Sequence, residues 1–141
     1  MCWKSKEFKP LVSDGNDKIK KVCLLYNGNI HGYYYHNFIY ELNKEYQTNV
    51  SLLLDTDNFY SGSVGFHSYL YKEVSLIPNR YTLDAYLGTY FITAYSKTSD
   101  VVIVEGYIPK GATYYINENK EIISDRIVLT NITHRLTELY R

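Results

Sequence analysis

Short segments of strand length, separated by turn-forming residues, run through most of this chain. Residues 19–26 are mostly apolar and end at Asn27-Gly28, a dipeptide that favours a tight hairpin turn. Asn43 is the expected left-handed residue of a second turn, between residues 32–40 and 45–48. Strand-length runs that alternate with turns are typical of antiparallel sheets, so the sequence predicts a mainly antiparallel sheet.

The last third of the chain repeats this pattern. Strands are expected over residues 100–108, 112–116 and 121–130, with turns at residues 109–111 and 117–120. Three strands in quick succession indicate an antiparallel meander. Residues 133–141 are expected to form a short terminal helix or a frayed tail.

In one segment the apolar residues recur at helical spacing and do not alternate as in a strand. Thr82 is a suitable N-cap, and apolar side chains then recur at helical spacing, at Leu83, Tyr86, Leu87, Tyr90 and Ala94. This spacing predicts one amphipathic helix over residues 82–95. With about six strands and a single main helix, the expected fold class is α+β, because a doubly wound α/β sheet needs helices between its strands.

Length and charge narrow the function. A chain of 141 residues fits a single domain, residues 1–141, whose first 17 residues are expected to be irregular. The 15 Lys and Arg residues balance the 15 Asp and Glu residues, so the basic surface that binds nucleic acid or anionic membranes is not expected. The sequence shows neither a signal peptide nor a run of apolar residues long enough to span a membrane, which predicts a cytoplasmic protein.

Tyrosine is the compositional anomaly, with 17 residues against five Phe and one Trp. A tyrosine ring fills a half-buried pleated surface while its hydroxyl stays hydrated or finds a partner. The tyrosines therefore serve either as the aromatic residues of an ordinary sheet or as a binding surface.

The sequence lacks the usual motifs of metal and cofactor sites. His31 and His36 are five residues apart, which places them on opposite faces of a strand, and no Cys-x-x-Cys pair exists, so zinc is not expected. The sequence also lacks the glycine-rich phosphate loops and the nucleophile elbow. No cofactor is predicted.

The two cysteines, Cys2 and Cys23, are expected to be reduced, and neither is expected to be a nucleophile. Cys23 lies in an apolar strand segment, where a thiol behaves as a small hydrophobic group. The alternative is that removal of Met1 exposes Cys2 as an N-terminal nucleophile.

Polar side chains interrupt the apolar pattern at a few turns and strand ends, where binding residues are often placed. Strict alternation over residues 123–129 puts Asp125 on the same face as three apolar side chains, so it marks a cleft or is paired structurally. The predicted ligand-binding residues are His67, Tyr69, Lys110, Tyr115, Asp125 and Arg126. Of these, His67, Lys110, Asp125 and Arg126 are expected to converge on one pocket.

The segments 1–6, 65–69, 108–115 and 124–126 resemble a family of small proteins from phages and prophages of the Bacteroides type. The resemblance covers nearly the whole chain. It implies a phage or mobile-element accessory protein in the cytoplasm of a bacterial host, and it brings no assigned activity.

A weaker similarity is to the ADP-ribosyltransferase-like superfamily. Asn27 stands where that family has a histidine, and Asp125 or Ser124 stands where it has a catalytic glutamate. Both departures imply a site that binds a nucleotide better than it turns one over.

We therefore expect, first, a protein that binds a nucleotide-type small molecule by aromatic stacking and charged hydrogen bonds, and so sequesters a host defence signal. The second hypothesis is an ADP-ribosyltransferase-like enzyme that acts on NAD or on a phosphorylated end, with His67 as acid/base and Asp125 as the carboxylate. The third is a structural or host-protein-binding phage protein with a tyrosine-rich interface. The sequence leaves homo-oligomerisation open.

Overall fold

The computed structural model describes residues 3–5, 9–32, 38–48, 54–56, 60–62, 65–70, 100–118 and 120–135. Every regular element in these residues is a strand. The strands are β1 (Trp3–Ser5), β2 (Leu11–Val12), β3 (Lys18–Tyr26), β4 (Asn29–Gly32), β5 (Ile39–Tyr40), β6 (Glu45–Gln47), β7 (Leu54–Thr56), β8 (Tyr60–Gly62), β9 (Phe66–Leu70), β10 (Asp100–Tyr107), β11 (Thr113–Ile116), β12 (Glu121–Ser124) and β13 (Arg126–Arg135).

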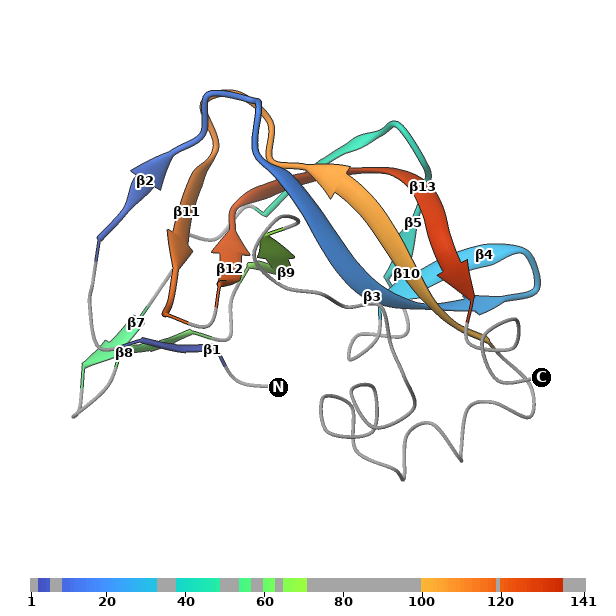
Figure 1. The fold of residues 1–141 in the computed structure, drawn as a ribbon, viewed down its shortest axis with the longest axis horizontal. Helices are drawn as coiled ribbons and strands as arrows, with labels where there is room; N and C mark the ends of the chain where they lie inside the picture. The colour runs from blue at the N-terminus through green and yellow to red at the C-terminus, as the bar shows by residue number, and fades with distance from the viewer. Residues whose placement is uncertain are drawn as a thin grey trace.

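The strands form two antiparallel sheets. The small sheet has the order β1-β8-β7, and the large sheet has ten strands, eight of them in the order β2-β11-β12-β9-β3-β10-β13-β6. β4 pairs with β3 and β5 off this path. Figure 1 shows β3, β10 and β13 as long curved strands that lie side by side at the centre of the large sheet.

The large sheet curls round on itself because one stretch of chain belongs to both halves. β12 and β13 are separated only by Asp125, yet β12 pairs with β9 whereas β13 pairs with β10. β9 and β10 both pair with β3, so the hydrogen-bonded neighbours run from β12 through β9, β3 and β10 to β13. The curled sheet therefore has an inner and an outer face.

The hydrophobic core fills the inner face. Its buried members are Ile19, Cys23, Ile30, Tyr40, Phe66, Val102, Val104, Ile108, Ala112, Ile122, Ile127 and Leu129. Side chains on the outer face are also buried in places, as Leu24 and Ile103 show with 3% and 2% exposure. The central strands therefore bury apolar side chains on both sides, which explains why residues 22–25 are all apolar.

The turn chemistry of the sequence is confirmed. Asn27 and Gly28 have φ angles of 49° and 78°, and they join β3 to β4 in a tight hairpin. Asn43 has a φ of 62° and turns the chain from β5 into β6. Asparagine and glycine tolerate this left-handed backbone, and the choice depends on local sterics alone.

The predicted α+β class, with its suggestion of an ADP-ribosyltransferase-like arrangement, is wrong. The described residues form an all-β structure in which a ten-stranded antiparallel sheet replaces the expected six or so strands. The helix expected over residues 82–95 lies outside the described residues. Strands of two or three residues, such as β2 and β5, carry no periodicity of their own and exist because distant segments supply their hydrogen-bond partners.

The predicted meander is also wrong. β10 and β11 follow each other in the sequence but are not neighbours, because β10 lies between β3 and β13 while β11 lies between β2 and β12. β13 runs on to Arg135, so residues 133–135 are strand where a helix or tail was expected. The N-terminal residues 1–17 contribute β1 and β2.

Gly106 marks the closest approach of β10 to β13. A Cβ atom added there would overlap the carbonyl oxygen of Val128 and lie 3.0 Å from the Cα of Leu129, so the backbones must separate to admit it. We expect Gly106→Ala to lower the free energy of unfolding by about 1–3 kcal/mol, measured by urea denaturation.

Gly28→Asn is the matched control, because Gly28 has open space around it and asparagine accepts its positive φ. The control should change the free energy of unfolding by less than about 0.5 kcal/mol. Equal stability of Gly106→Ala and the wild type would contradict the tight contact between β10 and β13.

Candidate functional site

Four aromatic rings meet on the inner face of the curled sheet, and we call Phe38, Tyr40, Tyr46 and Phe66 the aromatic cluster. The Phe38 ring centroid lies 4.7 Å from that of Tyr40 and 5.4 Å from that of Tyr46. Tyr40 and Tyr46 are 5.2 Å apart in an edge-to-face arrangement, and Phe66 lies 6.0 Å from Phe38. Such geometry is favoured by the ring quadrupoles and adds stability beyond area burial.

Local chain geometry brings these rings together. Tyr40 of β5 lies opposite Ile30 of β4, and Tyr46 of β6 lies opposite Ile127 of β13. Both rings therefore enter the core from strands of the large sheet. The turn at Asn43 joins the two strands, and the Glu41 amide donates a 2.7 Å hydrogen bond to the Tyr46 hydroxyl. The cluster therefore packs a side chain of β5 against a side chain of β6.

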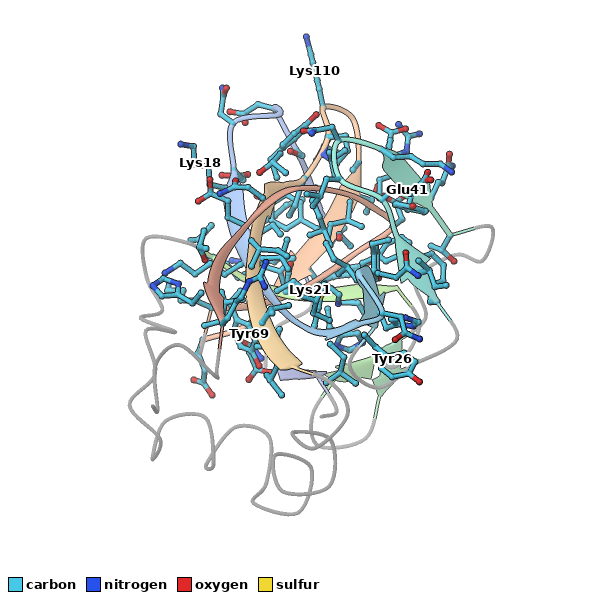
Figure 2. All side chains as sticks on the ribbon, turned by 90° about the vertical axis from the view of Figure 1, so that its right-hand side faces the viewer. Lys18, Lys21, Tyr26, Glu41, Tyr69 and Lys110 are labelled. Carbon is cyan, nitrogen blue, oxygen red and sulfur yellow. The ribbon has the colours of Figure 1, made fainter. Side chains whose placement is uncertain are left out.

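Lys21 is the charged residue of this region. It lies on the inner face of β3, between Ile19 and Cys23, and opposite Val104 of β10. Its ammonium nitrogen donates a 2.6 Å hydrogen bond to the main-chain carbonyl of His67 and lies 6.0 Å from the Tyr40 ring centroid. Figure 2 shows Lys21 near the middle of the view, inside the outline of the curled sheet.

The position of Lys21 follows from a split in the edge of β3. β9 pairs with β3 at Ile19 and Lys20, and β4 takes over from Cys23 onward. Between these two pairings β9 diverges from β3, and the Lys21 ammonium binds the His67 carbonyl at that point. Lys21 thus satisfies a main-chain acceptor inside the sheet, because a buried carbonyl without a donor is costly.

Burial sets the protonation of the groups around Lys21. Desolvation lowers the pKa of Lys21, with Cys23 opposing the shift, and no carboxylate forms an ion pair with Lys21 among the described residues. Desolvation raises the pKa of Cys23 to about 11, and the pKa of Tyr40 also rises well above its usual range because of burial, then Cys23 and Tyr46. At neutral pH the thiol and the phenol are therefore protonated.

Ser68 adds a hydroxyl to the inner face of β9. It is 2% exposed, and within the described part of the chain its Oγ has no hydrogen-bond partner. The pairing of Ile19 with Leu70 and of Lys20 with Tyr69 would bring Lys21 opposite Ser68 if the ladder continued. An amine and a thiol thus lie on neighbouring inner-face positions of β3, and a hydroxyl lies on the inner face of β9.

The aromatic cluster reaches the surface at Phe38, which is 38% exposed. Lys44 lies over the outer edge of the cluster, with its ammonium 5.3 Å from the Tyr46 ring centroid, and its charge is paired with Glu41 at 3.3 Å. The charge of Lys44 is therefore neutralised, in contrast to that of Lys21.

Three of the predicted site residues share the outer face. In the strand register, His67 is opposite Ile123, which is opposite Tyr115 on the next strand, and Tyr69 is opposite Glu121. The rings of Tyr69 and Tyr115 are nearly buried, with 7% exposure each.

Asp125 and Arg126 lie at the kink between β12 and β13. The Asp125 carboxylate accepts a 3.0 Å hydrogen bond from the Thr113 amide, and its main-chain oxygen accepts one of 2.9 Å from the Thr48 amide. The alternation of inner and outer residues breaks here, since Ile122 and Ile127 both belong to the core cluster. Arg126 has a buried Nε with no hydrogen-bond partner among the described residues.

Lys110 is exposed in the turn between β10 and β11. Figure 2 shows its side chain extending outward from the top of the molecule, away from Tyr69. The structure therefore groups His67, Tyr69 and Tyr115 on one face, places Asp125 and Arg126 at the strand kink, and directs Lys110 to solvent.

The sequence analysis missed Lys21 and the aromatic cluster. The signal for Lys21 was present, because alternation along residues 19–26 puts it on the same face as Ile19, Cys23 and Leu25. A lysine on the apolar face of a strand, like the aspartate at position 125, either needs a structural partner or marks a cleft. The cluster had no comparable signal, since Tyr40 meets Phe66 only through sheet topology.

Among the described residues, no group of His, Cys, Asp and Glu side chains could hold a metal ion, and no helix has the length and apolarity needed to cross a bilayer. Cys23 is a free, buried cysteine, and Cys2 lies outside the described residues.

In comparisons with known proteins, no family model, no curated protein and no solved structure matches this chain significantly.

The carboxylate of Asp125 has a definite structural partner, so its removal should be felt in stability. We expect Asp125→Ala to lower the free energy of unfolding by about 1–2 kcal/mol, because the Thr113 amide loses its acceptor at the kink. Asp125→Asn keeps an acceptor oxygen and should lose less than half as much in the same urea titration. A larger loss for Asn than for Ala would show that charge, rather than the hydrogen bond, matters there.

Burial of Cys23 makes stability depend on alkaline pH. The unfolded thiol ionises near its usual pKa of 9.0, whereas the folded thiol ionises near 11, so the unfolded state binds fewer protons between these values. The free energy of unfolding should therefore fall as pH rises from 9 to 11, by on the order of 1 kcal/mol per pH unit. Cys23→Ala should show a smaller fall in urea titrations over this range, and parallel curves for both proteins would contradict the assignment.

Proposed function

We propose that the protein binds a nucleotide-type small molecule at the aromatic cluster, with Lys21 as the cation that meets the ligand's anionic group. The observation that carries this proposal is the pairing of charges. Lys44 has its carboxylate in Glu41, but among the described residues Lys21 has only a main-chain carbonyl. An ammonium in apolar surroundings is costly, and a bound anion would offset part of that cost.

The aromatic cluster supplies the second half of the recognition. A purine or pyrimidine ring stacks on aromatic side chains, and Phe38 is the ring that both contacts the cluster and reaches solvent. The proposal keeps the ligand class predicted from the sequence but uses different residues. For a phage or mobile-element accessory protein, as the family resemblance implies, such binding would serve to sequester a nucleotide signal of the host.

The ADP-ribosyltransferase-like alternative gains no specific support. Asn27 and Gly28, which that similarity would place in a nucleotide site, form the exposed turn between β3 and β4. We therefore favour a binding protein over an enzyme.

The test is a thermal-shift panel of nucleosides, nucleoside mono-, di- and triphosphates, NAD and cyclic dinucleotides. A ligand that binds only the folded state at a hundredfold excess over Kd adds about 2.7 kcal/mol of stability. We expect at least one phosphorylated ligand to raise Tm, the matching nucleoside to raise it less, and Lys21→Met to weaken binding by about tenfold or more.

Lys18→Met is the matched control, because Lys18 is an exposed residue of the same strand and should leave binding unchanged. Affinity should fall as pH rises through the lowered pKa of Lys21, since only the protonated amine attracts an anion. A panel without any shift, or full binding by Lys21→Met, would overturn the proposal.

A further inference from the structure

We propose that Lys21 is also a covalent carbonyl-binding site, at which its amine condenses with a planar aromatic aldehyde to form an imine. This inference goes beyond nucleotide binding and concerns the ligand-free form of the same site.

The position of the amine is the first observation, because Lys21 is a half-buried residue of the inner face. Lys21 projects from β3 into the core, where its neighbours along the strand are Ile19 and Cys23 and its partner across the ladder is Val104. The only hydrogen bond of its nitrogen within the described residues goes to a main-chain carbonyl, which accepts from an amine and an ammonium alike. No carboxylate there holds the amine in its charged form.

Burial acts in opposite directions on the two nucleophiles of this strand. Desolvation favours the neutral amine of Lys21, which is the form that attacks a carbonyl carbon. The same desolvation favours the neutral thiol of Cys23, which is the unreactive form of a cysteine. The interior therefore selects the amine over the thiol.

The reaction needs no component beyond the aldehyde. The Lys21 nitrogen forms a bond to the carbonyl carbon, a proton moves from nitrogen to oxygen, and the resulting carbinolamine loses water to leave a carbon–nitrogen double bond. Atoms balance as amine plus aldehyde gives imine plus water. Ser68, whose buried hydroxyl has no partner among the described residues, is the group we assign to carry the proton.

The aromatic cluster defines the ligand class. Tyr40 lies 6.0 Å from the Lys21 nitrogen, and its ring contacts Phe38, which is 38% exposed. A flat aromatic aldehyde that enters beside Phe38 would place its ring against this cluster and its carbonyl towards Lys21. An aliphatic aldehyde of similar reactivity lacks the ring contacts.

The experiment uses the full-length protein, pyridoxal as the probe and sodium cyanoborohydride to reduce the imine, followed by peptide mapping by mass spectrometry. We expect the label on Lys21 at neutral pH, formed severalfold faster than on the exposed Lys44, since the lowered pKa of Lys21 leaves more of its amine neutral. Propanal should show a smaller preference for Lys21.

Lys21→Arg should remove this label while Lys44→Arg, the matched control, should leave it. If Lys21→Arg fails to fold, the comparison of Lys21 with Lys44 within the wild-type protein still decides. Equal labelling of the two lysines, or labelling of Lys21 only in denaturant, would overturn the inference.

A nucleotide identified by thermal shift should protect Lys21 from pyridoxal, which links the two proposals. Labelling of Lys21 without any nucleotide shift would sustain the covalent site and refute nucleotide binding. If a nucleotide raises Tm in a way that depends on Lys21 but Lys21 is not labelled selectively, nucleotide binding is supported and the covalent site is refuted.

Discussion

The kink at Asp125 is the constraint on which the curled sheet depends. The main chain of Asp125 bonds to Thr113 and Thr48, and its carboxylate also holds the Thr113 amide, so one residue is anchored to both halves of the sheet. Because β12 and β13 continue through this point, the strand can pair with β9 before the kink and with β10 after it. A regular strand would keep a single face inward and could not supply Ile122 and Ile127 to the same core.

The curled sheet in turn brings a few polar groups into its mainly apolar interior. Where β9 diverges from β3, a main-chain carbonyl loses its ladder partner, and the Lys21 ammonium takes that place. The same geometry brings the Tyr40 ring within 6.0 Å of the Lys21 nitrogen, and Tyr46 and Phe66 contact Tyr40 from two other strands. The candidate site is thus a consequence of how the sheet closes, and its amine is a structural donor to the His67 carbonyl.

Local features of the fold were predictable because they depend on neighbouring residues. The turns at Asn27 and Asn43 rest on backbone sterics, and the strand over residues 19–26 rests on its apolar content. The neighbours of β10 were not predictable, because strand order depends on contacts between residues far apart in the chain. Strict alternation failed at Asp125 for a related reason, since a hydrogen bond from Thr113 stabilises the kink.

The sequence by itself determined where the chain turns, which segments are strand-like and that Lys21 shares a face with apolar residues. Tertiary structure decided which faces meet. It brought Phe38, Tyr40, Tyr46 and Phe66 into one cluster with the Tyr40 ring near Lys21, left His67, Tyr69 and Tyr115 on the outer face, and turned Lys110 to solvent. The physical reason is that turn and strand preferences act over a few residues, whereas burial and ladder pairing join segments that only the closed sheet brings together.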